Sequence, residues 1–268
     1  MRKNYILLFI FIVAFSISGC SDSSKSKPVK INIPSFIEVG ENVTVDLNGD
    51  GIDETVYYGL DDFKLNNVSY KDLIQYNVYE NNPLSDNYII TDITTADSQR
   101  EIGLRVDGPS SDPETIFFTY DDEKLVEIGS IPSEINNLSE AFDGKGNLYG
   151  TLRLSVLQTW WAPAEWELSS DHVIQLKEQS VYYPIQYDTD LPIKLNVPLP
   201  IYDNAGDKEP VTTLNPQEVK LTATDNKNWC RVEGSDGTKG WFRIDNFNTV
   251  SDLGTDANSA FSNLCMAD

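Results

Sequence analysis

The stretch "DLNGDGIDE", residues 46–54, places oxygen-bearing side chains at a spacing that suits a metal ion. Hard donors stand at its first, third, fifth and ninth positions, with Gly51 at the sixth, where a sharp turn favours a residue without Cβ. A curled loop directs alternate side chains inward, and such a donor set suits Ca²⁺ better than Mg²⁺. The expected ligands are the side chains of Asp46, Asn48, Asp50 and Glu54 and the backbone carbonyl of Ile52.

The expected calcium has a structural role and not a catalytic one. An EF-hand requires a bidentate Glu at the twelfth position, where this chain has Tyr57, and a helix after the loop, where it has the strand-like "TVYYGL". A loop that surrounds the ion with protein oxygens leaves no open position for a substrate. Chelation is therefore expected to lower the melting temperature. A polar hairpin turn without metal is the alternative interpretation.

Aromatic residues in "LQTWWAPAEWEL" form the second candidate site. Trp160, Trp161 and Trp166 stand among Glu165 and Glu167, and indole rings beside carboxylates could stack against a sugar. The alternative is that these are core aromatics of a hairpin, the commoner environment of Trp. A glycosidase would need two carboxylates held about 5–10 Å apart across a cleft, and no such pair stands out among the 42 acids.

The elements that must position these residues are predicted to be strands almost throughout. Apolar and β-branched residues alternate between short polar turns, which favours hairpins. The segment 68–79 could form either a helix or a strand, and a helix is expected at 256–265 with Asp256 as its N-cap. The expected strands include 55–60, 87–93, 101–106, 115–120, 148–157 and 180–187.

An internal repeat connects the first loop to two later segments. "VDLNGDGIDETVYY" aligns with "TDITTADSQREIGL" after one inserted residue, so that Asp92, Asp97 and Glu101 match Asp46, Asp50 and Glu54, and "AFDGKGNLYGTLRL" is a weaker third copy. A period of about 45–50 residues is in the range of a propeller blade. The first loop resembles those of FG-GAP and VCBS-type β repeats, which lie between strands. This implies a propeller-like repeat of β-meanders, or a β-sandwich built from the same hairpins.

A change in composition and three prolines between residues 190 and 201 mark a domain boundary. After it, "NWCRVE" and "DGTKGWFRI" resemble the core of the bacterial Src-homology-3-like domain, through Trp229, Gly237, Gly240 and Trp241. The resemblance implies a small barrel that binds cell-wall peptide or glycan. The front of the chain departs from the family, because "IYDNAGDKEP" replaces its Arg and Gly-Pro opening. Tyr202 and Trp241 could line a peptide groove, or they could belong to the core.

The N-terminus predicts export. Residues 1–19 have two cations, a short apolar run and small residues, as in a signal peptide. "ISGC" resembles the lipobox of bacterial lipoproteins, which implies lipidation of Cys20 and anchoring without a membrane span. Residues 20–34 then form a flexible tether, 35–190 the repeat domain, 191–250 the barrel and 251–268 a tail. The outer membrane is the expected location in a cell that has one.

Charge and cysteine content restrict the partners. The formal charge of −22 makes a phosphate backbone repulsive, so no nucleic-acid partner is expected. Besides Cys20 the chain has Cys230 and Cys265, which could form a disulfide in an exported protein or remain buried thiols.

Together these features predict an all-β, lipid-anchored surface protein that acts as a non-catalytic binding or structural module of the cell wall. No catalytic constellation is recognisable, and a single histidine, His172, gives little material for one. The alternative is a cell-wall hydrolase or other carbohydrate-active enzyme whose catalytic residues the sequence does not reveal. A purely structural protein without a small ligand is a third possibility.

Overall fold

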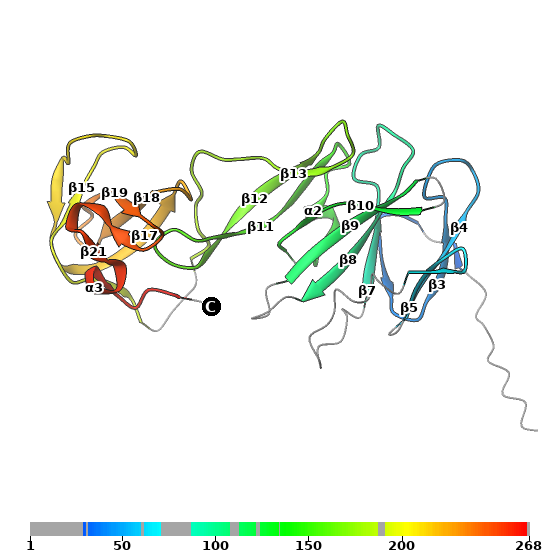
Figure 1. The fold of residues 1–268 in the computed structure, drawn as a ribbon, viewed down its shortest axis with the longest axis horizontal. Coiled ribbons are helices and arrows are strands. Elements are labelled where there is room, and N and C mark those ends of the chain that lie inside the picture. Colours follow the sequence, from blue (N-terminus) through cyan, green and yellow to red (C-terminus); the bar gives the residue numbers. More distant parts are fainter. Residues whose placement is uncertain are drawn as a thin grey trace, which may run out of the picture.

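The computed structural model describes residues 29–30, 32–59, 62–70, 87–107, 113–121, 124–133, 135–186 and 191–266. The predicted signal peptide, Cys20 and most of the tether therefore lie outside the described residues. The protein is all-β, as the sequence predicts, and Figure 1 shows its strands spread along one long axis. In the described part of the chain, no helix is long and apolar enough to cross a membrane.

The first sheet contains the first loop. Its strands lie in the order β1-β3-β4-β5-β6, and all neighbours are antiparallel except β1 and β3. The loop 46–54 joins β3 to β4. The bounds are β1 Val29–Lys30, β3 Asn42–Val45, β4 Glu54–Gly59, β5 Asp62–Leu65 and β6 Val68–Ser69.

The second sheet is an antiparallel meander with one early strand added. Its order is β10-β9-β8-β7-β2, and a bulge between Glu127 and Gly129 interrupts the pairing of β9 with β10. The second copy of the loop joins β7 to β8, just as the first joins β3 to β4. The bounds are β2 Ser35–Glu38, β7 Asn87–Thr91, β8 Glu101–Asp107, β9 Pro113–Asp121 and β10 Lys124–Ile131.

The third sheet consists of a long hairpin and one short strand, β11 Asn147–Leu154, β12 Trp160–Leu168 and β13 Ile174–Leu176. The one-turn helix α2, Leu138–Ala141, precedes it and is capped by the Asn137 side chain. The third copy of the loop follows α2 and leads into β11.

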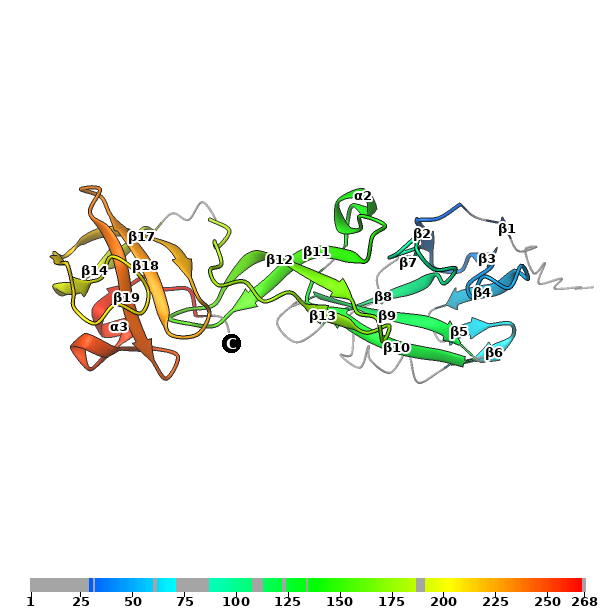
Figure 2. The ribbon, with the colours of Figure 1, turned by 90° about the horizontal axis from the view of Figure 1, so that it is seen from above.

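The second sheet is buried on both faces because its side chains alternate between two cores. Along β9, Ile116 and Phe118 pack with residues of the first sheet, whereas Phe117 packs with residues of the third sheet and of α2. In β7, Tyr88 and Ile90 face the first core and Ile89 the second. A strand with one exposed face would alternate apolar and polar residues. These strands instead contain continuous apolar runs, because the sheet lies between two cores (Figure 2).

The C-terminal part is a second body built on a seven-stranded sheet that curls into a half-barrel (Figures 1 and 2). Its order is β21-β20-β19-β18-β17-β14-β22, with β15 and β16 paired separately. The bounds are β14 Ile193–Leu195, β15 Leu199–Ile201, β16 Thr212–Leu214, β17 Gln217–Thr224, β18 Trp229–Gly234, β19 Lys239–Asp245, β20 Thr249–Val250, η3 Ser251–Leu253, β21 Thr255–Asp256, α3 Ala257–Ala260 and β22 Phe261–Ser262.

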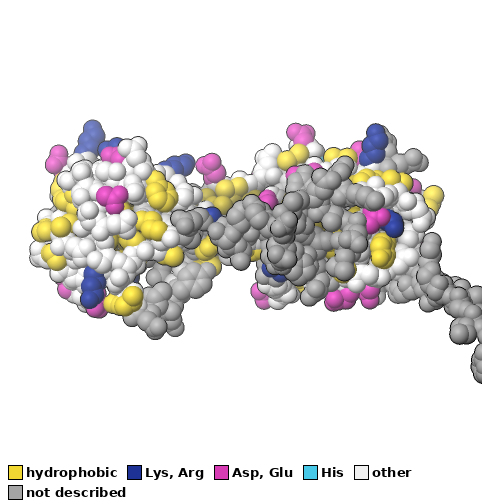
Figure 3. Space-filling model, turned by 60° about the horizontal axis from the view of Figure 1, so that its bottom comes forward, with side chains coloured by type: hydrophobic (Ala, Val, Ile, Leu, Met, Phe, Trp, Pro, Cys, Tyr) yellow, Lys and Arg dark blue, Asp and Glu magenta, His cyan; other side chains and the backbone are white. Residues whose placement is uncertain are grey.

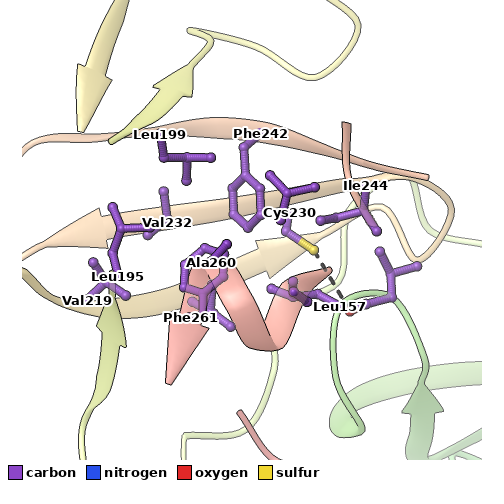
Figure 4. Packing of buried hydrophobic residues seen from close by; sticks show 14 of the residues in the cluster. Leu157, Leu195, Leu199, Val219, Cys230, Val232, Phe242, Ile244, Ala260 and Phe261 are labelled. Carbon is purple, nitrogen blue, oxygen red and sulfur yellow. Dashed lines mark hydrogen bonds between the residues drawn. The ribbon is translucent and has the colours of Figure 1, made fainter. Parts of the chain in front are cut away.

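The hairpin β11–β12 belongs to both bodies. Near its base, Leu148 and Trp166 lie in the core shared with the second sheet. At its other end, Leu154, Leu157 and Trp160 lie in the core of the C-terminal sheet. Figure 4 shows Leu157 packed beside the C-terminal core residues, and Figure 1 shows the hairpin running between the two bodies. The two cores are therefore connected by one continuous element.

Two segments differ from the sequence-based expectations. The expected strand at 180–187 does not form over its described residues 180–186, where Tyr182 makes only an isolated bridge with Thr224. Pro184 has no backbone N–H to donate to a ladder, which accounts for the interruption. At the C-terminus, Asp256 is the N-cap of α3, as expected, but the helix ends after one turn and β22 then pairs with β14.

Candidate functional site

The loop 46–54 is held by hydrogen bonds between its own side chains and backbone. The Asp46 carboxylate accepts from the amides of Gly49 and Gly51, at 2.7 and 3.0 Å. Asn48 Oδ1 accepts from the Asp50 amide at 3.1 Å. In turn, Asp50 Oδ1 accepts from the amide of residue 52 at 2.7 Å. Gly51 has φ of +85°, the left-handed conformation that the sixth position requires.

Glu54 closes the loop from its ninth position. Its side chain is buried, and Oε2 accepts a 2.8 Å hydrogen bond from the amide of Leu47. Burial raises the pKa of Glu54, the Leu47 hydrogen bond opposes this, and the charges of Asp50 and Asp46 raise the pKa further. A buried carboxylate beside two others carries a repulsion that a cation would relieve.

Asp53 points away from this donor set, as its place in the alternation predicts. Both of its carboxylate oxygens accept from Lys30 Nζ, at 2.8 and 2.9 Å. The donor types of the loop fit calcium, because a carboxylate oxygen that accepts one N–H keeps a second lone pair for a metal. Within the described ranges, however, no three His, Cys, Asp or Glu side chains are grouped so that they could hold a metal ion.

The second loop repeats three hydrogen bonds of the first. Glu101 Oε2 accepts from the Ile93 amide at 2.9 Å, the bond that Glu54 makes with Leu47. Asp97 Oδ1 accepts from the amide two residues later, as Asp50 does, and Thr94 Oγ1 takes the place of Asn48 Oδ1. The alignment with one inserted residue therefore pairs residues that make matching hydrogen bonds, although the described residues 92–101 lack the positive φ of Gly49 and Gly51.

The three loops lie side by side and are joined by equivalent backbone bonds. The Arg100 amide donates to the Leu47 carbonyl at 2.8 Å, and the Gly146 amide donates to the Ile93 carbonyl at 2.9 Å. Leu47 and Ile93 occupy the same place in successive copies, so each loop is bonded to the next in the same way. Arg100 also donates its guanidinium Nη1 to the Asp46 carbonyl.

His172 is a site residue that the sequence did not reveal. It lies in the turn between β12 and β13, and its Nε2 is 3.2 Å from Glu101 Oε1. The Glu101 side chain is fully buried, and that of His172 is 25% exposed. The hydrogen bond with Glu101 raises the pKa of His172, burial opposes this, and the charges of Glu101, Asp97 and Asp121 raise the pKa as well.

The three Trp residues of β12 do not share one surface. Trp160 is 5% exposed in the C-terminal core, and Trp166 is 4% exposed in the core of the third sheet. Trp161 points to the opposite side of the strand and is half-buried. Its cross-strand neighbour is Arg153. Trp160 and Trp166 are therefore core residues. Trp161 is the Trp of this stretch that a ligand could reach.

Tyr202 and Trp241, the candidate groove pair, are brought together. Their backbones form an antiparallel bridge with N–H···O distances of 2.7 and 2.8 Å. The Tyr202 ring is buried edge-on against Trp229, with centroids 5.3 Å apart, and its hydroxyl donates to Asp252 Oδ1 at 3.0 Å. Trp241 is half-buried. Of this pair, only Trp241 has appreciable accessible surface.

The two C-terminal cysteines are free thiols in this structure, so the disulfide considered from the sequence is not formed. Cys230 is buried in the C-terminal core, where its Sγ lies 3.9 Å from the Val156 carbonyl (Figure 4), and Cys265 is exposed. Burial raises the pKa of the Cys230 thiol.

No protein-family model, curated protein or solved structure matches this chain.

Proposed function

We propose that this chain is a lipid-anchored surface lipoprotein whose two β bodies act as one non-catalytic binding or structural module at the cell wall. The supporting observation is the hairpin β11–β12, which contributes side chains to the cores of both bodies. A shared element of this kind suits a protein that holds one body at a fixed place relative to the other. On the face shown in Figure 3, Lys, Arg, Asp and Glu side chains lie scattered among uncharged and hydrophobic ones.

Anchoring through Cys20 is tested by incorporation of a labelled fatty acid in a bacterial host. The wild-type chain is expected to carry the label and to fractionate with membranes. Cys20→Ala is expected to lose both properties, and Cys265→Ala, which removes the exposed C-terminal thiol, is expected to keep them. Labelling of the Cys20→Ala chain would overturn the assignment.

The proposed arrangement of the repeat domain, residues 35–190, is a propeller-like stack of three β-meanders stabilised by one structural Ca²⁺. The stacked sheets, the equivalent loops and the bonds between them support the repeat. The calcium ligands would be those expected from the sequence: Asp46, Asn48, Asp50, Glu54 and the carbonyl of Ile52. When bound, the ion would offset the repulsion among the carboxylates, and its binding energy would stabilise the folded state.

Calcium is tested by titration calorimetry and by melting curves of the whole chain with Ca²⁺ or with EDTA. Ca²⁺ at 100 times its Kd is expected to add ~2.7 kcal/mol to the stability. Asp50→Asn is expected to weaken binding, whereas the matched control Asp53→Asn, which removes the same charge from a side chain turned toward Lys30, is expected to bind like the wild type. Equal melting curves with Ca²⁺ and EDTA would overturn the calcium site.

Cell-wall binding is proposed at the half-exposed face of Trp241, next to the Tyr202 backbone. The resemblance of the C-terminal body to Src-homology-3-like domains supports this ligand class. Retention of the whole chain on purified peptidoglycan is expected for the wild type and for Tyr183→Ala, an exposed aromatic outside the candidate pair, and is expected to fall for Trp241→Ala. The whole chain is used because residues 154–160 complete the C-terminal core. No retention of the wild type would overturn this target.

A further inference from the structure

The second loop contains a buried charged cluster that the proposed calcium site does not use. Glu101 is fully buried, and it needs a partner because an isolated buried charge is strongly destabilising. The Ile93 amide satisfies Oε2. Oε1 faces His172 Nε2 at 3.2 Å, and among the described residues neither atom has a hydrogen bond to any other group.

The second loop also lacks features that make the first suit a metal. Thr94 replaces the amide of Asn48, and no glycine follows Asp97 where Gly51 follows Asp50. Glu101 is nevertheless buried, as Glu54 is, and it accepts the equivalent hydrogen bond from a backbone amide. A partner for its second carboxylate oxygen comes from another part of the chain, where His172 Nε2 lies 3.2 Å from Oε1.

The turn that carries His172 is fixed independently of this contact. The Ser169 amide donates to the Val173 carbonyl at 2.9 Å, the His172 amide donates to the Ser169 carbonyl at 3.0 Å, and the Val173 amide donates to Ser169 Oγ at 3.2 Å. Next to the turn, β13 packs closely on β10, because a Cβ on Gly129 would come within 3.1 Å of Ile174. The imidazole is thus held at the second sheet by its own turn.

We infer that His172 is a proton-dependent counter-ion of the second loop: its imidazolium neutralises Glu101, and loss of the proton weakens the attachment of the β12–β13 turn to the loop 92–101. The described surroundings are mainly acidic. Asp97 and Asp121 lie near the imidazole, and Asp92 lies near Glu101, Arg100 and Asp97, so that Arg100 is a cation that also faces these carboxylates. The raised pKa of His172 agrees with this environment.

The sign of the pH effect follows from the direction of the shift. The folded protein binds this proton more tightly than the unfolded chain, in which His has its ordinary pKa of 6.5. The contribution to stability is therefore complete below about pH 6.5 and is lost as the pH rises through the pKa of the folded state. It does not depend on calcium, since Glu101 is not one of the proposed ligands.

A proton NMR titration measures this directly, because the untagged chain contains one histidine and its imidazole signal needs no assignment. The wild-type midpoint is expected above 6.5, and Glu101→Gln, which can still accept from the Ile93 amide, is expected to move it back toward 6.5. Asp171→Asn removes an exposed neighbouring charge and is expected to leave the midpoint closer to the wild type than Glu101→Gln does. A wild-type midpoint at or below 6.5, or one that Glu101→Gln does not lower, would overturn the inference.

Melting temperatures at pH 6 and pH 8, in EDTA, provide a second readout. The wild type is expected to lose about 2–4 °C more than His172→Gln over this interval, the size of shift that a modest stability change gives in a chain of this length. Asp171→Asn is expected to keep the pH dependence of the wild type. If His172→Gln shows the same pH dependence as the wild type, the imidazole is not the titrating group, whatever the result for calcium.

Discussion

The amide of Arg100 donates a 2.8 Å hydrogen bond to the carbonyl of Leu47 and so joins the second loop to the first. Gly49 lies at the same junction, where a Cβ would come within 2.2 Å of the Ser98 side chain and 2.7 Å of its carbonyl. The first loop is thus supported by its neighbour as well as by its own hydrogen bonds.

Gly49→Ala is expected to be more destabilising than Gly40→Ala. Both glycines have positive φ, +75° and +91°, so alanine carries a similar conformational cost of roughly 1–2 kcal/mol at each. Only the Gly49 variant also meets Ser98, since nothing lies within 4 Å of the corresponding position at Gly40. Urea unfolding measures the free energy of unfolding of both variants. Equal losses of stability would mean that the loops 46–54 and 92–101 are not in contact at Gly49.

Trp160→Ala is expected to destabilise the protein by ~3–5 kcal/mol, the usual cost of removing a large buried aromatic side chain. Tyr183→Ala is the control, because that ring is 65% exposed, and its effect is expected to remain within about 0.5 kcal/mol. Unfolding followed by fluorescence and by circular dichroism gives both values. Similar losses for the two variants would contradict the placement of the hairpin end in the C-terminal core.

Cys265 is expected to react with a maleimide in the native protein, and Cys230 only after denaturation. Cys265 is exposed, whereas Cys230 is buried and its raised pKa disfavours the reactive thiolate. Peptide mass spectrometry after timed labelling distinguishes the two sites without substitution. Rapid native labelling of Cys230, or a native disulfide between the two, would contradict the structure.

Tyr202→Phe is expected to cost about 0.5–1.5 kcal/mol, the net value of one hydrogen bond, because it removes the bond to Asp252 and keeps the ring against Trp229. A double-mutant cycle with Asp252→Ala isolates this bond from other effects of either change. A coupling energy near zero would show that the hydroxyl is bonded to water instead.

The parts of the fold that the sequence predicted depend on local patterns. The turn at Gly51, the strands that follow Glu54 and Glu101, and the N-cap at Asp256 are each determined by a few adjacent residues. The strand boundaries at 55–60 and 101–106 therefore came within a residue or two of those in the structure.

The parts that it did not predict depend on contacts between distant segments. Nothing near His172 indicates Glu101, because the pairing requires the β12–β13 turn to reach the second sheet. Trp160 and Trp166 look alike in the sequence, yet they enter different cores because they lie toward opposite ends of β12. The segment 180–187 has strand-like composition, but its described residues 180–186 make only separate backbone hydrogen bonds with β17 and β12, at Tyr182 and Ile185, and no continuous ladder.

The change in composition near residue 190 and the division of the cores do not coincide. Residues 154–160 come before the prolines in sequence, but their side chains fill the C-terminal core. A gene fragment cut at that change would leave one product with exposed Leu157 and Trp160 and the other with the space they fill left empty. Transfer of the C-terminal body into another protein therefore requires the end of this hairpin to travel with it, and recombination at the apparent linker would separate two halves of a single packing unit.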